Sequence, residues 1–164
     1  LASNRADSVR ALGARTKLGS TMTWGMAFTN DTDVAMTLTR VSYSAQQWGF
    51  ANTNDHTLAF SCLVTNRLDW IVNYGDGWDD CAETSAQVLG LEDPHATPEV
   101  TAVEYLPIGD AVRVMPGEIL TLRWRLLPPA KGSSALMAID DLAVAFEAAA
   151  RPTLIRIVHA ARRP

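Results

Sequence analysis

The sequence predicts an all-β protein built as an antiparallel two-sheet sandwich, and three observations support this fold class. Apolar residues recur at every second position in several segments, which is the period of strands that bury one face. Clusters of Gly, Pro, Asn and Asp separate these segments, as turns do in antiparallel sheets. The length of 164 residues, with 48% hydrophobic and 20% charged residues, suits one globular domain.

The first half of the chain contains three such segments. In residues 22–28 the even positions are Met, Trp, Met and Phe, and the polar residues 29–33 predict the turn that follows. Val34, Met36 and Leu38 continue on one face, but the apolar phase then moves by one residue to Val41 and Tyr43. This shift predicts a β-bulge or a bend. Residues 58–64 alternate again and predict a third strand.

The second half is patterned mainly towards its end. Residues 66–97 show no sustained period, and they predict one short strand at about 70–74 followed by long loops. Further strands are predicted at 100–106, 111–115, 120–126 and 136–146, with a turn at Pro116-Gly117. Trp24 and Trp124 lie within regular alternation and are expected in the core. The alanines of 146–150 favour a linker over a helix. We therefore expect a sandwich module over residues 1–148, then a linker and the first strand of a following domain in 149–164.

Composition excludes several classes of partner. The net charge is −4 with both signs mixed along the chain, so no basic stripe suggests nucleic acid. The longest apolar runs are too short to insert into a membrane.

Because the chain begins at Leu1 rather than Met, we expect a processed or excised form whose secretion signal would lie upstream. Cys62 and Cys81 are compatible with one disulfide, and two buried thiols are the alternative.

Enzyme motifs are absent from the sequence. There is no nucleophile elbow, phosphate loop, dinucleotide fingerprint or zinc-protease motif. His56, His95 and His159 stand in different segments without a partner at ligand spacing. We expect no catalytic residue and no required cofactor.

Carboxylates are the stronger candidates for chemistry. Asp76, Asp79 and Asp80 crowd around Gly77, and calcium takes several oxygen ligands from such loops. A solvated acidic turn is the alternative.

Asp140 is in phase with Leu142, Val144 and Phe146, so we expect it to point towards the core. A carboxylate there must be paired, hydrogen-bonded or metal-bound, because desolvating it alone is costly. We expect Asp140 to tie down an adjacent loop, and a structural calcium ion is the competing role. A glycosidase pair of Asp140 with Asp79 or Glu83 is a remote alternative.

Aromatic residues of the middle segment suggest a glycan platform. Trp70 and Tyr74 are in phase on the short predicted strand, and Trp78 follows in a loop rich in Gly and Asp. Sugar rings stack on indole and phenol rings while acids such as Asp76 accept hydrogen bonds from the hydroxyls. The alternative for Trp70 is a place in the core.

Several segments together resemble a β-sandwich module of large secreted and cell-surface proteins of environmental bacteria, which often carry a C-terminal membrane-sorting anchor. The last segment is also similar to the final strand of MAM-like and concanavalin-like jelly rolls. The segments are Arg10-Ala11-Leu12-Gly13, Gly19-Ser20-Thr21, Ala27-Phe28-Thr29-Asn30-Asp31-Thr32, Val41-Ser42-Tyr43, Gln46-Gln47-Trp48, Thr57-Leu58-Ala59-Phe60, Leu122-Arg123-Trp124 and Met137-Ala138-Ile139-Asp140-Asp141-Leu142-Ala143-Val144.

This resemblance implies a jelly-roll sandwich, secretion or display on the cell surface, and a place among other domains of the same chain. It implies no catalytic residues, and a role in adhesion or carbohydrate binding. The chain departs from the pattern at residues 125–134, where members usually have acidic and glycine residues, so a cation held there is not expected.

Together these patterns predict a non-catalytic extracellular module that binds a polysaccharide or other glycan. A structural or adhesive spacer that contacts proteins is the alternative.

Overall fold

The computed structural model describes residues 2–3, 10–16, 19–48, 56–66, 78–80, 86–88, 99–107, 111–128 and 135–149. The regular elements in these ranges are all strands, in two antiparallel sheets. None of the described residues belongs to a helix long and apolar enough to cross a membrane. The strands are β1 (Ala2–Ser3), β2 (Arg10–Ala14), β3 (Met22–Thr29), β4 (Met36–Trp48), β5 (His56–Thr65), β6 (Asp79–Asp80), β7 (Ala86–Val88), β8 (Glu99–Tyr105), β9 (Arg113–Val114), β10 (Ile119–Leu126) and β11 (Leu136–Ala148).

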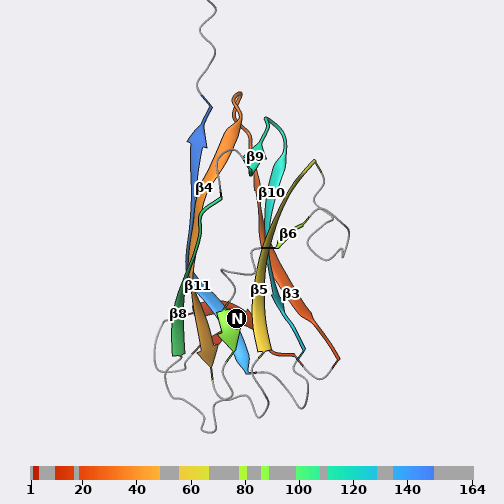
Figure 1. Cartoon of the computed structure of the whole chain (residues 1–164), viewed down its shortest axis with the longest axis vertical. Coiled ribbons are helices and arrows are strands. Elements are labelled where there is room, and N and C mark those ends of the chain that lie inside the picture. Colours follow the sequence, from red (N-terminus) through yellow and green to blue (C-terminus); the bar gives the residue numbers. More distant parts are fainter. Residues whose placement is uncertain are drawn as a thin grey trace, which may run out of the picture.

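The order of the strands confirms the predicted jelly-roll sandwich. The six-stranded sheet has the order β1-β2-β11-β4-β8, with β9 also paired to β4. The five-stranded sheet has the order β3-β10-β5-β6, with β7 also paired to β5. The two sheets stand face to face in Figure 1, and the chain crosses between them at β2–β3, β3–β4, β4–β5, β7–β8, β9–β10 and β10–β11. The four-strand sets β2-β11-β4-β8 and β3-β10-β5-β6 are the two sheets of a jelly roll.

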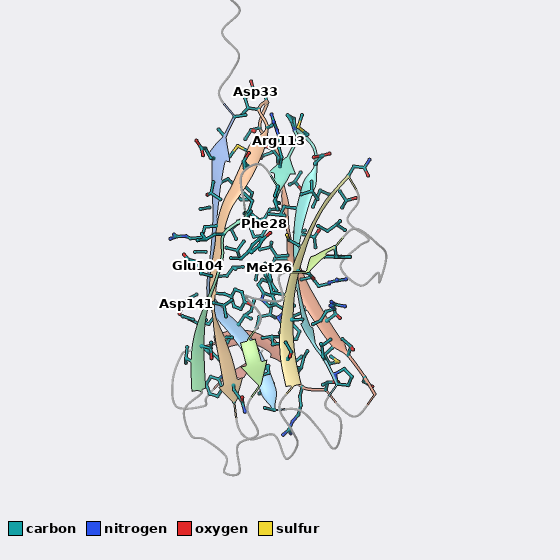
Figure 2. The ribbon with its side chains drawn as sticks, in the orientation of Figure 1. Met26, Phe28, Asp33, Glu104, Arg113 and Asp141 are labelled. Atoms are coloured by element: carbon teal, nitrogen blue, oxygen red, sulfur yellow. The ribbon has the colours of Figure 1, made fainter. Side chains whose placement is uncertain are left out.

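The core lies between the sheets because alternate residues of the long strands point inward. Trp124 of β10 is fully buried, and its ring centroid is 5.4 Å from that of Tyr43 and 5.3 Å from that of Phe60. Trp24 is half-buried beside this cluster, and Phe28 points into the space between the sheets in Figure 2. The core position expected for Trp124 is therefore confirmed, whereas Trp24 packs against the core and stays partly exposed.

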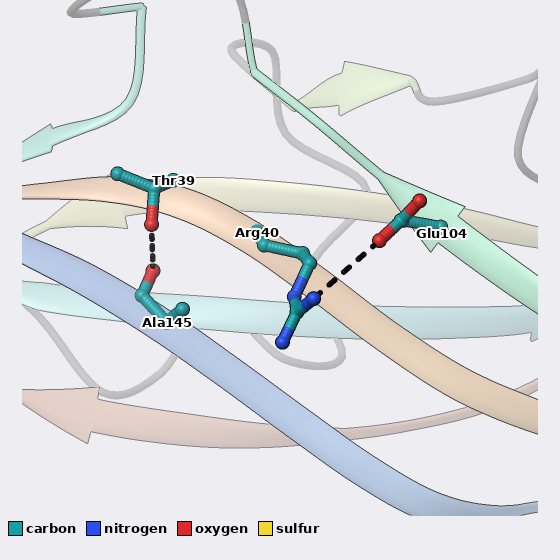
Figure 3. Close-up of polar contacts among 4 residues, drawn as sticks. All are labelled: Thr39, Arg40, Glu104 and Ala145. Atoms are coloured by element: carbon teal, nitrogen blue, oxygen red, sulfur yellow. Dashed lines mark hydrogen bonds and ion pairs between the residues drawn. The ribbon is translucent and has the colours of Figure 1, made fainter.

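The predicted bulge near Val41 is also confirmed. In the register of β4 with β11, Ala145 is opposite Arg40 and Phe146 is opposite Leu38, so Thr39 has no partner of its own. The Thr39 hydroxyl donates a 3.1 Å hydrogen bond to the carbonyl oxygen of Ala145 (Figure 3). The extra residue moves the inward phase of β4 by one position, which is the shift visible in the sequence.

Other predicted elements have different outcomes. The strands at 22–28, 58–64, 100–106, 120–126 and 136–146 are confirmed as β3, β5, β8, β10 and β11. The segment 111–115 forms only the two-residue β9, and residues 146–148 continue β11 instead of beginning a linker. The strand expected at 70–74 lies outside the described residues, as do residues 150–164, where a linker and the first strand of a following domain are expected.

The predicted turn at Pro116-Gly117 is present. Gly117 has a φ of 81°, and the Glu118 amide donates a 2.9 Å hydrogen bond to the carbonyl oxygen of Met115. Proline followed by a glycine of positive φ is the pattern of a type II turn. This turn leads from β9, in one sheet, to β10, in the other.

Candidate functional site

A second bulge, in β11, places two adjacent carboxylates on the outer face of the six-stranded sheet. Asp140 is opposite Ser44 and Ala143 is opposite Ser42, so two residues of β11 face one residue of β4. The first of these two, Asp141, has a φ of 52°. Aspartate is among the few non-glycine residues that adopt this left-handed conformation readily. A bulge of this kind turns a side chain to a new direction.

The bulge overturns the expectation that Asp140 points towards the core. Ile139 is 3% exposed and belongs to the core, so Asp140, the next residue, points to the outer face, where it is half-buried. Leu142 packs against the core again because the bulge has reversed the alternation between these two positions. Asp140 fastens the bulge itself and not a loop, since its Oδ1 accepts a 2.9 Å hydrogen bond from the amide of Asp141.

Side chains of β4 and β11 join into one hydrogen-bonded row beside the bulge. The indole Nε1 of Trp48 donates to Oε1 of Gln46 at 3.0 Å, and Nε2 of Gln46 donates to Oδ2 of Asp140 at 3.2 Å. The Ser44 hydroxyl donates to Oδ2 of Asp141 at 3.2 Å. We call these five residues, Ser44, Gln46, Trp48, Asp140 and Asp141, the bulge cluster.

In the bulge cluster, hydrogen bonds hold the side chain of Gln46 in place, whereas the side chain of Asp141 is exposed. Gln46 is only 6% exposed, and an indole N–H can only donate, so the orientation of the Gln46 amide is fixed by its two partners. Trp48 is half-buried against Ala11 and Ala138, which form a small apolar cluster separate from the main core. Asp141 is exposed and points away from the core in Figure 2. The cluster thus offers the exposed carboxylate of Asp141 at one end of the row and the half-buried indole of Trp48 at the other.

The neighbouring edge strand leaves this face accessible on its β8 side. Ala102 of β8 is opposite Ser44 and is exposed, and Glu104 is opposite Ser42. Glu104 forms a 3.8 Å ion pair with Arg40, with both side chains about half exposed (52% and 53%; Figure 3). Such an exposed pair contributes little to stability.

Of the aromatic residues expected to form a glycan platform, Trp70, Tyr74 and Trp78, only Trp78 is among the described residues. Its ring lies over the guanidinium of Arg123, with Cζ 3.6 Å from the ring centroid. Arg123 is 3% exposed, and its Nε donates a 3.0 Å hydrogen bond to the Ser61 hydroxyl. Arg123 therefore covers one face of the Trp78 ring, and only the other face can stack on a sugar. Trp70, Tyr74 and Asp76 lie outside the described residues.

The described acids among those predicted to bind calcium lie on different sheets. Asp79 and Asp80 form β6 at the edge of the five-stranded sheet, opposite Cys62 and Ser61, whereas Asp140 is on the outer face of the other sheet. The core therefore separates them, which also argues against a catalytic pair of Asp140 with Asp79. Glu83 is outside the described residues. Within the described ranges, no group of three or more His, Cys, Asp or Glu residues is placed to hold a metal ion.

A disulfide between Cys62 and Cys81 stays a prediction. Cys62 is buried in the core at 2% exposure, and Cys81 lies outside the described residues.

Sequence reasoning missed most of the bulge cluster, although a signal for it exists. The apolar positions are odd-numbered at Met137 and Ile139 and even-numbered at Leu142 and Val144. This change of phase across Asp140 and Asp141 is the same kind of signal that correctly predicted the bulge in β4. Ser44, Gln46 and Trp48 carry no separate signal, because their meeting with Asp140 depends on the pairing of β4 with β11.

No protein-family model matches the chain, and neither a curated protein nor a solved structure shows a significant similarity to it.

Proposed function

We propose that this chain is a non-catalytic extracellular module that binds a glycan, within a larger secreted or cell-surface protein. The observation that carries the proposal is the bulge cluster, in which a hydrogen-bonded row fixes two carboxylates and an indole on an outer sheet face. Sugar hydroxyls donate to such carboxylates, and sugar rings have apolar faces that suit an indole. In ligand sites, a small number of precisely placed polar groups among aromatic side chains fixes the orientation of the ligand.

The hydrogen bonds of Asp140 support a binding role over a catalytic one. Its two oxygens are engaged by the Gln46 amide and by the backbone N–H of Asp141. A general acid or nucleophile needs a carboxyl group that can reach its substrate. Asp141, with an exposed carboxylate, is the better contact for a ligand, and Asp140 then positions the strand that carries it.

Affinity electrophoresis on a panel of polysaccharides tests the proposal. We expect at least one neutral polysaccharide to retard the wild-type chain, and Asp141→Asn to weaken the retardation about tenfold, in line with the loss of one charged hydrogen bond. Asn tolerates the same backbone conformation, so the bulge should persist. Glu104→Gln is the matched control, because it removes an exposed carboxylate from the adjacent strand without touching the cluster.

Three outcomes count against this assignment. If no polysaccharide retards the chain, glycan binding is wrong. If Trp78→Ala abolishes retardation and Asp141→Asn does not, the glycan binds at the middle segment and not at the bulge cluster. Equal losses in Asp141→Asn and Glu104→Gln would point to a general charge effect.

The alternative function is a structural or adhesive module that contacts other proteins. The observation that favours it is β8, which ends the strand path of the six-stranded sheet and exposes apolar side chains there: Val100 is 56% exposed, and Leu106, just beyond the strand, is 58% exposed. Edge strands with exposed apolar residues are prone to pair with a further strand. Failure of every glycan, together with self-association that is lost in Val100→Lys, would favour this alternative.

A further inference from the structure

The described residues form a pocket of about 220 Å³ at one end of the sandwich, far from the bulge cluster along the strands. It lies beside the β3–β4 turn, at the end marked by Asp33 and Arg113 in Figure 2. Both sheets contribute to its apolar wall, which consists of Phe28, Met36, Val114, Leu120 and Phe146.

The mouth of the pocket is fixed before any ligand arrives. The Asn30 side chain, 7% exposed, donates from Nδ2 to the carbonyl oxygen of Val114 at 2.9 Å, and its Oδ1 accepts from the Thr32 amide and hydroxyl. The Asn30 backbone adds two bonds to the β9–β10 turn, from its N–H to Glu118 and from Gly117 to its carbonyl oxygen. A rim held in this way does not have to be ordered on binding, which favours affinity.

A single carboxylate stands at this mouth. Asp31 lines the pocket and is exposed, and within the described ranges no hydrogen bond or ion pair engages its side chain. Phe28 and Phe146 supply aromatic rings to the wall. A carboxylate above aromatic rings is complementary to a positive charge attached to an apolar body, because both the anion and the ring faces attract a cation.

We propose that this pocket binds a small organic cation of roughly nine non-hydrogen atoms, in which an ammonium group is joined to an apolar body. The size follows from volume, because an apolar cavity of about 150 Å³ accommodates benzene, so 220 Å³ holds about half as much again. The apolar body lies against Phe28, Met36 and Phe146, the half-buried side chains of the wall, and the ammonium group faces Asp31. This site is independent of the proposed glycan surface.

Three probes of similar size and different charge test the proposal: 2-phenylethylammonium, 2-phenylethanol and phenylacetate. Titration is followed by NMR of methyl-labelled protein, through the methyl signals of Met36, Val114 and Leu120. We expect the ammonium compound to shift these signals with a dissociation constant on the order of 1 mM, as suits so small a ligand. The alcohol should bind about three- to fivefold more weakly, the range of an exposed charge pair, and phenylacetate more weakly still.

Asp31→Asn is the decisive variant, and Asp33→Asn is its control in the same turn. Asp31→Asn should remove the preference for the ammonium compound while leaving the alcohol unchanged, and Asp33→Asn should leave both unchanged. Equal binding of all three probes, or shifts that map away from the pocket, would overturn the proposal. So would concentration-dependent shifts of the same methyl groups without any probe, which would assign the pocket to a second copy of the chain.

Discussion

The side-chain amide of Asn30 donates a 2.9 Å hydrogen bond to the carbonyl oxygen of Val114, a residue 84 positions further along the chain. The same amide also donates to the carbonyl oxygen of Val34 at 2.9 Å. One buried side chain thus joins the turn after β3 to the strand β9 of the opposite sheet. We expect this position to contribute strongly to the stability of the sandwich.

Asn30→Ala should therefore lower the free energy of unfolding by about 2 kcal/mol or more, because it leaves buried polar groups without partners. Urea denaturation followed by tryptophan fluorescence measures the change. Asn66→Ala, at an exposed asparagine just after β5, should stay within about 0.5 kcal/mol of the wild type. A loss below about 0.5 kcal/mol in Asn30→Ala would show that water replaces these bonds without cost.

Substitutions at Asp141 can separate the backbone strain of the bulge from the role of the Asp141 carboxylate. Its φ of 52° is accessible to Gly and Asn but costly for a β-branched residue. We expect Asp141→Val to destabilise the chain by about 1–3 kcal/mol, while Asp141→Gly and Asp141→Asn stay close to the wild type. Thermal unfolding of the three variants provides the comparison, and equal melting temperatures would contradict the left-handed conformation.

Trp124 is expected to dominate the energy of the core. Its ring is fully buried and contacts both Tyr43 and Phe60. Trp124→Ala should cost about 3–5 kcal/mol. Trp124→Phe should cost clearly less, because it keeps an aromatic ring and because no described residue accepts a hydrogen bond from the indole Nε1. Equal losses in the two variants, measured by urea denaturation, would mean that the indole N–H has a partner.

Gly13 lies where β2 approaches β11 most closely. A Cβ at this position would collide with the carbonyl oxygen of Met137 and with Ala138. Gly13→Ala should therefore cost more than Gly117→Ala, where space is open and the positive φ alone costs about 1–2 kcal/mol. Melting temperatures rank the two, and the opposite order would show that β2 can shift away from β11 without penalty.

The fold could be predicted from sequence because its long strands bury one face each. Residues 22–28 and 120–126 pair with each other in β3 and β10, and their alternation follows directly from that pairing. The bulge at Thr39 was predictable for the same reason, since an extra residue in one strand of a pair shifts the apolar phase by one position. β2 was not predicted as a strand, because its short segment holds only Leu12 as a large apolar residue.

The candidate site was harder to predict because it depends on contacts between strands distant in sequence. The direction of Asp140 was predicted wrongly, since alternation was continued through a bulge that reverses it. The link from Gln46 to Asp140 spans 94 residues, and no local pattern reveals such a link. Trp78 was a candidate for stacking on a sugar. Its contact with the buried Arg123 depends on the order β10-β5-β6 in the sheet, which no local sequence pattern reveals.

The strand order has a consequence for biosynthesis. β11 lies between β2 and β4, and β10 lies between β3 and β5, so each sheet receives its central strand last. A nascent chain on the ribosome cannot join the early strands until residues 119–148 have been translated, and until then β2, β3, β4 and β5 have open edges. Such non-local pairing slows folding and exposes strand edges to aggregation. We therefore expect the cell to protect the growing polypeptide with chaperones, and arrest peptides placed at successive lengths to register folding force only after the last strand has left the exit tunnel.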